Sequence, residues 1–423
     1  MVRAQLATAL VRTAARLSRM TGRGDGSVIG GRIGLAVEPR LLTVLARGRE
    51  VALVSGTNGK TTTTRLLTAA LGTLGPVASN SYGANMPTGH TTALAQSRNA
   101  RHAVLEVDEH YLRTVLAETR PRVVALLNLS RDQLDRAMEV GMLADRWREV
   151  LGALREQADT PGAEPTRVVA NCDDPLVTWA ASAAPQVTWV AAGQRWQEDS
   201  WVCPQCGAHL KREGVDWACP GCDLRRPQPS WWLADDDTVA GPDGIRQPVT
   251  LQLPGRVNRA NAVTALAAAA LFGVRPADAA PRLAEVASIA GRYATVERDG
   301  RSIRLLLAKN PAGWLEAFDM VDRISTAGAA PPPVLLSINA RVVDGLDTSW
   351  LYDVDYASLR GHRVLVTGDR RYDLAVRLEV NEVPFEVVDT FGEVLAAIPP
   401  GRLEVIANYT AFQDIRAELG RAN

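Results

Sequence analysis

The chain has 423 residues, of which 46% are hydrophobic and 22% charged, a composition typical of a soluble globular protein with two or three domains. Forty-seven basic residues balance 47 acidic ones, so the net charge does not favour nucleic acid or another polyanion as a partner. No apolar run approaches the roughly 18–20 residues that cross a bilayer, and the N-terminal region lacks the apolar core and cleavage site of a signal peptide. We therefore expect a cytoplasmic protein.

Residues 1–48 are predicted to form an N-terminal helical segment. The first 20 residues have helical periodicity, and a glycine-rich turn is expected from Thr21 to Gly34. The helix carries an apolar stripe and a set of arginines, namely Leu6, Leu10, Ala14 and Leu17, and Arg3, Arg12, Arg16 and Arg19. Two interpretations stay open: the helix packs on the body of the protein, or it is a basic amphipathic surface that visits the inner face of an anionic membrane.

Residues 49–290 are predicted to form a central α/β domain. A short apolar strand at residues 51–54 runs into a glycine-containing loop, and residues 65–74 are predicted to be helical. Further apolar strands alternate with helical stretches, at residues 103–107, 123–128, 168–171 and 187–191. This alternation is typical of a doubly wound parallel sheet. The alanine-rich residues 258–272 are predicted to form a helix of the same domain.

The loop after the first strand has the composition of a phosphate-binding loop; its residues are Gly56, Thr57, Asn58, Gly59, Lys60, Thr61 and Thr62. Glycines let backbone N–H groups approach phosphate oxygens, and the start of the following helix adds positive potential. Lys60 would reach the terminal phosphates of a nucleotide, and the Thr61 hydroxyl would ligate Mg²⁺. Lys60 is one of three lysines in a chain that otherwise uses arginine, which favours a specific role. A chance match is the alternative, because the general motif has glycine where Val54 stands.

Four of the five cysteines form two Cys-x-x-Cys pairs: Cys203, Cys206, Cys219 and Cys222. The spacing predicts a zinc ribbon over about residues 200–226, inserted into the central domain, with four thiolates closing a structural site. A redox pair or disulfides are the alternative, which a reducing compartment disfavours. The ribbon is too small for a core of its own, so metal binding would supply its folding energy. Four tryptophans are expected to wrap it: Trp201, Trp217, Trp231 and Trp232.

Residues 291–423 are predicted to form a second, smaller, Rossmann-like α/β domain. Its strands are expected at residues 303–307, 334–338, 364–367, 385–388 and 403–407. A proline-rich loop at residues 326–333 separates the first two.

The sequence Gly-Thr-Asn-Gly-Lys-Thr-Thr resembles the phosphate loop of the Mur ligase superfamily, whose members join carboxylates to amines through acyl phosphates. Glu106 is similar to that family's strand-end glutamate for Mg²⁺, and Asn258 with Asn261 to its asparagine pair on the adenine side. Other matching segments follow in order: Asn128 to Asp135, Asn171 to Asp174, and Gly291-Arg292-Tyr293 at the hinge to the C-terminal domain. The resemblance covers about residues 49–423 and implies a P-loop ATPase domain that uses ATP, with Mg²⁺ held by Thr61 and Glu106.

Several positions depart from the family pattern. Only 54 residues precede Ser55, too few for the UDP-binding domain of ligases that act on nucleotide-linked precursors. Gln133 replaces a histidine, and no lysine between Lys60 and Lys211 can be carbamylated to hold a second Mg²⁺. Where other members read Asp-Tyr-Ala-His-Asn-Pro, this chain has Leu-Ala-Lys-Asn-Pro, and Lys309 becomes a candidate nucleotide-binding residue. How a second Mg²⁺ is held stays open.

These departures, the zinc ribbon and an acidic segment from Asp344 to Asp355 together resemble the MurT family. MurT proteins are the synthetase subunits of lipid II isoglutaminyl synthases and are partnered by the glutaminase GatD. The resemblance implies ATP-dependent amidation of the D-isoglutamate α-carboxylate in the stem peptide of lipid II, with ammonia from a GatD-like glutaminase. The chain offers no cysteine in a glutaminase-like setting, because four belong to the ribbon and Cys172 is expected to be an ordinary buried or loop residue.

Asp347 is the candidate for a residue shared with that partner. A glutaminase cysteine needs a histidine base, and the histidine usually needs a carboxylate that orients it. The resemblance implies that the synthetase lends this carboxylate from an Asp-x-Ser-Trp motif, which Asp347 to Trp350 match. Which of the neighbouring acids completes the triad stays open, the others being Asp344, Asp353 and Asp355. The alternative is a set of solvated loop carboxylates.

Two other functions also stay open. An amino-acid-adding ligase of the folylpolyglutamate or cyanophycin type likewise lacks a UDP-binding domain, but the ribbon and the acidic segment argue against it. A zinc ribbon can also belong to a nucleotide-gated module that binds nucleic acid. The neutral net charge and the acidic run at residues 235–237, beside the ribbon, argue against that class.

Overall fold

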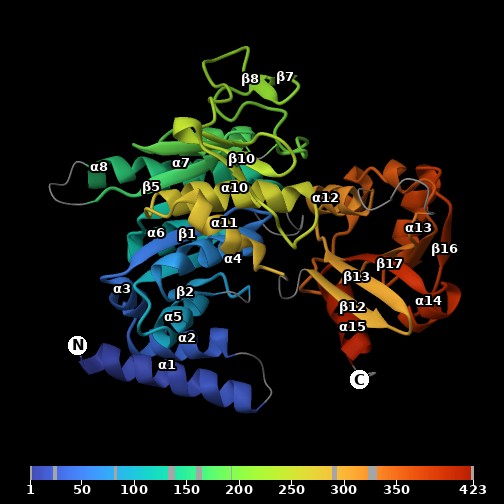
Figure 1. Cartoon of the computed structure of the whole chain (residues 1–423), viewed down its shortest axis with the longest axis horizontal. Coiled ribbons are helices and arrows are strands. Elements are labelled where there is room, and N and C mark those ends of the chain that lie inside the picture. Colours follow the sequence, from blue (N-terminus) through green and yellow to red (C-terminus); the bar gives the residue numbers. More distant parts are fainter. Residues whose placement is uncertain are drawn as a thin grey trace. The chain divides into compact units, whose positions relative to one another are not determined.

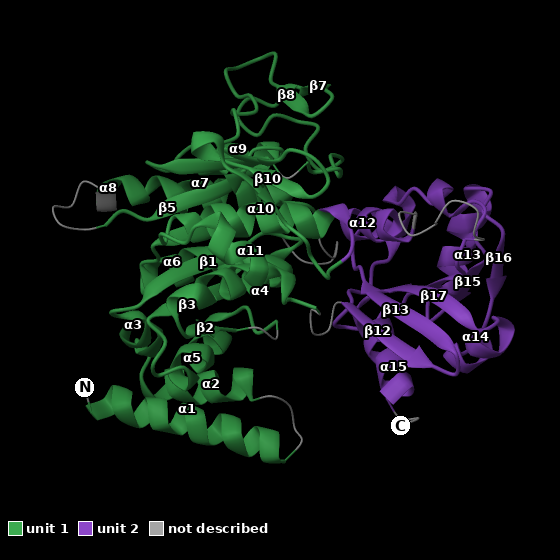
Figure 2. Cartoon of the chain, in the orientation of Figure 1, with its two compact units in different colours: residues 1–130, 139–253, 257–287 green, residues 131–138, 254–256, 288–423 purple. Residues whose placement is uncertain are grey.

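The structure of the chain is a computed structural model that describes residues 2–21, 26–80, 83–131, 139–158, 164–191, 193–287, 293–322 and 331–420. These residues group into two units (Figure 2). Unit 1 comprises residues 1–130, 139–253 and 257–287, and unit 2 comprises residues 131–138, 254–256 and 288–423. Two predicted motifs lie outside the described residues, namely Asp132 to Asp135 and the hinge residues Gly291 and Arg292.

β1 (Glu50–Ser55) lies inside the nine-stranded sheet that the described part of unit 1 forms, in the order β11-β10-β9-β6-β5-β4-β1-β3-β2. Within this sheet, every pair of neighbouring strands between β9 and β2 is parallel. The pairs β9 with β10 and β10 with β11 are antiparallel. The other strands are β2 (Val77–Ser79), β3 (His102–Val107), β4 (Val123–Leu126), β5 (Arg167–Asn171), β6 (Val187–Ala191), β9 (Trp231–Leu233), β10 (Thr238–Ala240) and β11 (Arg246–Pro248). The predicted doubly wound α/β fold is confirmed.

The strand order reverses at β1, which has β3 on one side and β4 on the other. β1, β3 and β4 are buried on both faces, as expected for parallel strands covered by helices. One core joins these strands to α4 (Lys60–Leu71) and α10 (Arg256–Ala270). In doubly wound sheets, ligands bind at the carboxyl ends of the strands where the order reverses, and the loop after β1 lies at such a point.

The remaining helices of unit 1 cover the sheet and its edge (Figure 1). They are α1 (Val2–Met20), α2 (Ser27–Val37), α3 (Leu41–Ala46), α5 (Pro87–Gln96), α6 (Leu112–Thr119), α7 (Val140–Gly152), α8 (Leu154–Ala158), α9 (Pro175–Ala181) and α11 (Pro276–Ala284). No helix in the described part of the chain is long and apolar enough to cross a membrane.

The N-terminal helices correct one prediction and show which face of α1 is buried. The expected glycine-rich turn is wrong from residue 27 onward, because α2 is a helix. The helix α1 is confirmed, but its leucine stripe does not face the body of the protein; the buried residues are Ala7, Val11 and Ala15, and the exposed ones are Leu6, Leu10 and Leu17. The glycines of α2 admit α1 so closely that only its small side chains fit between the two helices.

The cysteine-containing segment leaves the sheet after β6 and returns at β9. It holds an antiparallel pair, β7 (Lys211–Glu213) and β8 (Asp216–Ala218). Its small apolar cluster consists of Cys203, Leu210, Trp217, Cys219 and Leu224. Only one of the four tryptophans expected to wrap the ribbon belongs to this cluster: Trp217 does, Trp231 packs in the core of the main sheet, and Trp201 and Trp232 are exposed.

Unit 2 is built on a six-stranded sheet with the order β12-β13-β17-β14-β15-β16, parallel except for the pair β12 and β13. The strands are β12 (Tyr293–Arg298), β13 (Arg301–Leu307), β14 (Val334–Ser337), β15 (Val364–Thr367), β16 (Phe385–Val387) and β17 (Gly401–Ala407). The helices are α12 (Pro311–Asp322), α13 (Arg371–Val380), α14 (Phe391–Ala397) and α15 (Tyr409–Gly420). Two apolar clusters pack around it, one containing Trp314 and Tyr356 and the other Phe412.

Candidate nucleotide and metal sites

The loop between β1 and α4 depends on two glycines. Gly56 has φ of +142° and Gly59 has φ of +84°, both in the region that favours glycine. A Cβ on Gly56 would lie 2.9 Å from the Cβ of Leu127, and one on Gly59 would lie 2.6 Å from the Oδ1 of Asn261. Lys60 then begins α4, so the first N–H groups of the helix are available to an anion.

The same loop is fixed by the segment that follows β4. The backbone N–H of Thr57 donates to the carbonyl of Asn128 at 2.9 Å, and the N–H of Asn58 donates to the Asn128 side-chain oxygen at 2.9 Å. The N–H of Ser130 donates to the Thr57 hydroxyl at 3.0 Å. Asn128 and Ser130, which belong to a predicted family motif, therefore hold the loop in its shape.

The Lys60 ammonium is buried and fully engaged within the chain. It donates to the carbonyls of Gly56 at 2.5 Å and Thr57 at 3.1 Å, and to the Glu109 carboxylate at 2.8 Å. Both charged side chains are at most 7% exposed. A buried ion pair with several hydrogen bonds keeps the lysine directed along the loop. Sequence reasoning missed Glu109, although it stands only three residues after Glu106.

Glu106 is buried completely, and neither of its carboxylate oxygens has a hydrogen-bond partner among the described residues. Its position is set by Val54, its register partner in β1, and by its own backbone: the carbonyl accepts from Asn80 Nδ2 and His90 Nε2, and its N–H donates to Asn80. The Thr61 hydroxyl is likewise buried without such a partner. An unpartnered buried carboxylate is costly, and a cation offsets that cost.

These donors fit Mg²⁺, which prefers carboxylate and hydroxyl oxygens and reaches phosphates at the same time. The geometry therefore brings Lys60, Thr61 and Glu106 into one region at the carboxyl end of β1 and β3, as the sequence predicted. His90 and Asn80 were not predicted, and no local pattern distinguishes them. Burial lowers the pKa of His90 from its usual 6.5 to about 4, so the ring is neutral at pH 7.

α10 supplies the predicted asparagine pair. Asn258 and Asn261 are three residues apart, so they lie on the same face of the helix, and both are buried. Asn261 packs against Gly59 of the loop, as the close approach to the Gly59 Cβ position shows.

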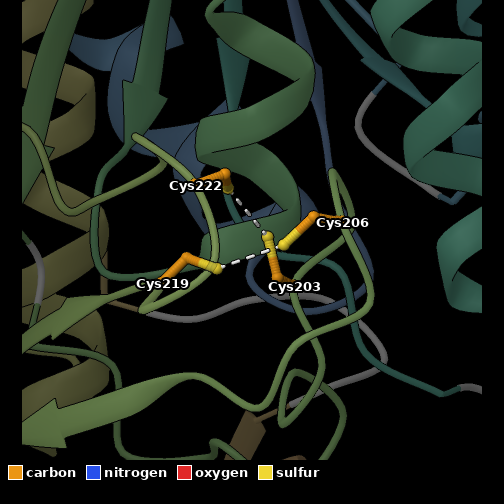
Figure 3. A group of neighbouring side chains, drawn as sticks. All are labelled: Cys203, Cys206, Cys219 and Cys222. Atoms are coloured by element: carbon orange, nitrogen blue, oxygen red, sulfur yellow. Dashed lines mark hydrogen bonds between the residues drawn. The ribbon is translucent and has the colours of Figure 1, made fainter.

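The four paired cysteines converge. Figure 3 shows their sulfur atoms pointing toward one another from two turns of the inserted segment, and all four lie within 4.8 Å of each other. The Sγ atoms of Cys203 and Cys222 are 3.6 Å apart, and those of Cys206 and Cys219 are 3.4 Å apart. A tetrahedral zinc with bonds of about 2.3 Å separates its sulfur ligands by about 3.8 Å. All five cysteines are free, so the thiol set fits a metal and not disulfides.

The cysteine segment is attached to unit 1 at the turn after β5. Trp217 Nε1 donates to the carbonyl of Cys172 at 3.0 Å, and the Arg226 guanidinium donates twice to Asp173, at 2.9 and 2.8 Å. Asp174 caps α9. Burial raises the pKa of Cys172 to about 12, so this thiol is a buried, unreactive residue, as expected.

Two predicted site residues belong to unit 2. Lys309 follows β13, two residues before α12. Asp347 is exposed, and its Oδ1 accepts the N–H of Ser349 at 2.8 Å. This hydrogen bond lowers the pKa of Asp347, so the group is a carboxylate at pH 7.

The other acids of the same segment differ in their surroundings. Asp344 is buried and accepts from both the backbone N–H and the hydroxyl of Thr410. Asp353 accepts from Arg131 at 2.9 Å. Asp355 is exposed and accepts the backbone N–H two residues further on. Asp344 therefore holds the fold of unit 2, while Asp347 and Asp355 are accessible.

Comparison with known proteins identifies the family to which this chain belongs. Residues 54–269, half of the chain, match the model of the Mur ligase middle domain. The chain belongs to the Mur ligase family. Mur ligases use ATP and Mg²⁺, so the predicted class of ATP-dependent ligase is confirmed. Residues 307–412 match the model of the MurT ligase C-terminal domain.

This Mur ligase is similar, over nearly its whole length, to proteins called lipid II isoglutaminyl synthase (glutamine-hydrolyzing) subunit MurT. One from Streptococcus pneumoniae is 29% identical, with 95% of this chain and 93% of that protein covered. One from Staphylococcus aureus is 26% identical, with 98% and 97% covered. The predicted resemblance to MurT is thereby confirmed. A solved pseudomurein peptide ligase type C from Methanothermus fervidus shares the fold, with a TM-score of 0.66 and 17% identity over 90% of this chain and 80% of that one.

Proposed function

We propose that the chain is the synthetase subunit of a lipid II isoglutaminyl synthase. It amidates the α-carboxylate of D-isoglutamate in the stem peptide to D-isoglutamine, with ATP and with ammonia from a GatD-like glutaminase. One observation carries the proposal: the buried carboxylate of Glu106, which has no hydrogen-bond partner among the described residues, lies beside the strand that leads into the phosphate loop, in a chain whose full-length relatives are MurT subunits.

In this proposal the loop N–H groups and Lys60 bind the ATP phosphates, and Asn258 with Asn261 binds on the adenine side. Thr61 and Glu106 would hold Mg²⁺, which when bound supplies positive charge next to the phosphates. Lys60 already points along the loop through its bonds to Gly56 and Thr57. Lys309 of unit 2 is proposed as a further nucleotide contact, at the place of a family histidine.

The chemistry needs two displacements. An oxygen of the substrate carboxylate forms a bond to the γ-phosphorus of ATP while the bond to the β-phosphate oxygen breaks, which gives an acyl phosphate and ADP. Ammonia then forms the carbon–nitrogen bond, phosphate leaves with the electron pair of the carbon–oxygen bond, and the nitrogen loses a proton. Lys60 and the loop N–H groups stabilise the charge on the transferring group.

Asp347 is proposed to orient the histidine of the partner glutaminase. It is exposed and ionised at pH 7, and its hydrogen bonds to Ser349 fix the orientation of the carboxylate. Asp344 is a weaker candidate because its carboxylate is already bound to Thr410 inside unit 2. A carboxylate lent by the synthetase would make glutamine hydrolysis depend on assembly of the complex.

The remaining assignments concern metal and location. We propose that Cys203, Cys206, Cys219 and Cys222 hold one structural zinc that stabilises the inserted segment. We also propose that the enzyme works at the inner face of the cytoplasmic membrane, because its proposed substrate is lipid-linked.

Phosphate release by the purified chain with its glutaminase tests the function. Lipid II and glutamine together should stimulate release, and Lys60→Ala should abolish it. Lys211→Ala is the matched control, because this lysine is exposed on β7 and should leave the rate unchanged. If lipid II has no effect but glutamate with a polyglutamate acceptor drives release, the chain is an amino-acid-adding ligase instead.

A further inference from the structure

Helix α1 packs on unit 1 by its smallest side chains. Ala7, Val11 and Ala15 are buried along one face. They meet α2, where a Cβ on Gly30 would lie 2.9 Å from the Val11 carbonyl and one on Gly34 would lie 2.3 Å from the Val11 Cγ2. Such close helix contact leaves no freedom to rotate α1. The fold itself therefore determines which face of α1 points away from the protein.

The outward face is apolar. Leu6 and Leu17 are 57% and 55% exposed, and at 100° per residue the apolar exposed residues fall within an arc of about 80°. These residues are Val2, Leu6, Leu10, Leu17 and Met20. α2 adds exposed apolar side chains of its own: Val28, Ile29 and Ile33. α1 runs along the outside of α2 and contacts α5 only weakly (Figure 1). A monomeric protein rarely leaves five large apolar side chains on one face of a helix exposed to water.

The same region is strongly basic, although the chain as a whole is neutral. Residues 1–49 contain nine arginines and two acidic residues, so the rest of the chain carries the balancing excess of seven negative charges. α1 has no acidic residue at all. Arg3 and Arg16 are exposed, and at 100° per residue they lie within about 40° of the two edges of the apolar arc. An apolar face with basic flanks complements an anionic lipid surface, where arginines reach headgroup phosphates and leucines enter the acyl boundary.

We propose that α1 docks by its leucine face on an anionic lipid bilayer, with its axis in the plane of the membrane. This inference rests on the proposed function, because docking on the membrane would bring the synthetase to its lipid-linked substrate. The two are nevertheless separable, because lipid binding needs neither ATP nor turnover. The leucine face, residues Leu6, Leu10 and Leu17, contains none of the residues placed in the nucleotide or metal sites.

Vesicle flotation of the full chain tests the proposal. The protein should bind vesicles made of an equal mixture of phosphatidylglycerol and phosphatidylcholine. It should bind vesicles of pure phosphatidylcholine at least tenfold more weakly. Leu6→Ser with Leu17→Ser should lower binding to the anionic vesicles at least tenfold, since both side chains would enter the bilayer. Leu74→Ser is the matched control, because Leu74 is 44% exposed elsewhere in unit 1 and should bind like wild type.

A wild type that does not bind anionic vesicles would overturn the proposal, and so would a Leu74→Ser control that loses as much vesicle binding as the double variant. A double variant that binds vesicles as wild type does but no longer binds the glutaminase partner would also overturn it. The last would make the leucine face a protein interface. Amidation of lipid II in detergent micelles separates this question from the proposed function. The double variant should keep the wild-type rate there and lose it on vesicles, whereas a wild type inactive in micelles would contradict the proposed function and leave the vesicle result standing.

Discussion

Replacing Gly59 by alanine tests the arrangement of the phosphate loop and Asn261. Gly59 has φ of +84°, where a Cβ costs about 1 kcal/mol of folding free energy, and that Cβ would lie 2.6 Å from the Asn261 oxygen. Gly48 is a matched control, because its φ is +73° and nothing lies within 4 Å of its Cβ position. Both variants should lose about 1 kcal/mol of unfolding free energy, but only Gly59→Ala should displace Asn261.

Displacing Asn261 should weaken nucleotide binding by about one hydrogen bond. A hydrogen bond contributes about 0.5–1.5 kcal/mol, so the Kd for ADP should rise roughly two- to tenfold in Gly59→Ala. The Kd of Gly48→Ala should stay close to that of wild type. Titration calorimetry with ADP and Mg²⁺ measures the affinity, and urea unfolding without nucleotide measures the stability.

A double variant identifies the cause. If the alanine acts by pushing Asn261 away, adding Gly59→Ala to Asn261→Ala should change the ADP affinity little further, because the displaced group is already absent. Equal ADP affinity in Gly59→Ala and Gly48→Ala would refute the reasoning, since the close approach would then have no consequence for the nucleotide.

Three further predictions follow from other parts of the molecule. Cys206→Ser should reduce bound zinc from one per chain to less than half, measured by metal analysis, and should lower the Tm. Asp347→Asn should lower glutamine-driven amidation by orders of magnitude, and concentrated ammonium at raised pH should restore the product. Asp355→Asn, a change at an exposed acid of the same segment, should keep full activity. Failure of ammonium to rescue Asp347→Asn would contradict the shared triad. Because the pKa of His90 is lowered to about 4, the unfolded chain binds up to one more proton than the folded chain between pH 6.5 and 4. The unfolding free energy should therefore decrease as the pH is lowered from 6.5 to 4, by at most about 1.4 kcal/mol per pH unit. His90→Gln should flatten this slope in urea titrations.

The central strands and the phosphate loop could be predicted because each leaves a local mark in the sequence. β1, β3 and β4 are buried on both faces, so they are nearly continuous apolar runs. The loop after β1 needs glycines and a lysine at fixed positions, whatever the rest of the fold. β9, β10 and β11 are three residues each, too short for a periodicity to be visible, and none was predicted.

Other features depend on contacts between distant segments. His90 reaches the backbone of Glu106 in β3 from helix α5, and Glu109 becomes a partner of Lys60 only when β3 lies beside β1. The burial of α1 is a clearer case. A hydrophobicity pattern selects its leucines as the buried face, but the glycines of α2 accept only side chains as small as Ala7 and Val11. Close packing, which a single helix does not reveal, decides the outcome.

The ion pair between Lys60 and Glu109 has a consequence for the exchange of nucleotides. Because the ammonium already donates to Glu109 at 2.8 Å, a phosphate that approaches it must compete with a carboxylate of the chain itself. One anion is then exchanged for another, and the net gain from binding is smaller than a lone lysine would provide. The Glu109 carboxylate can form its ion pair with Lys60 again when ADP dissociates. If Lys60 binds the nucleotide phosphates as proposed, competition with Glu109 should weaken nucleotide binding and speed the release of ADP.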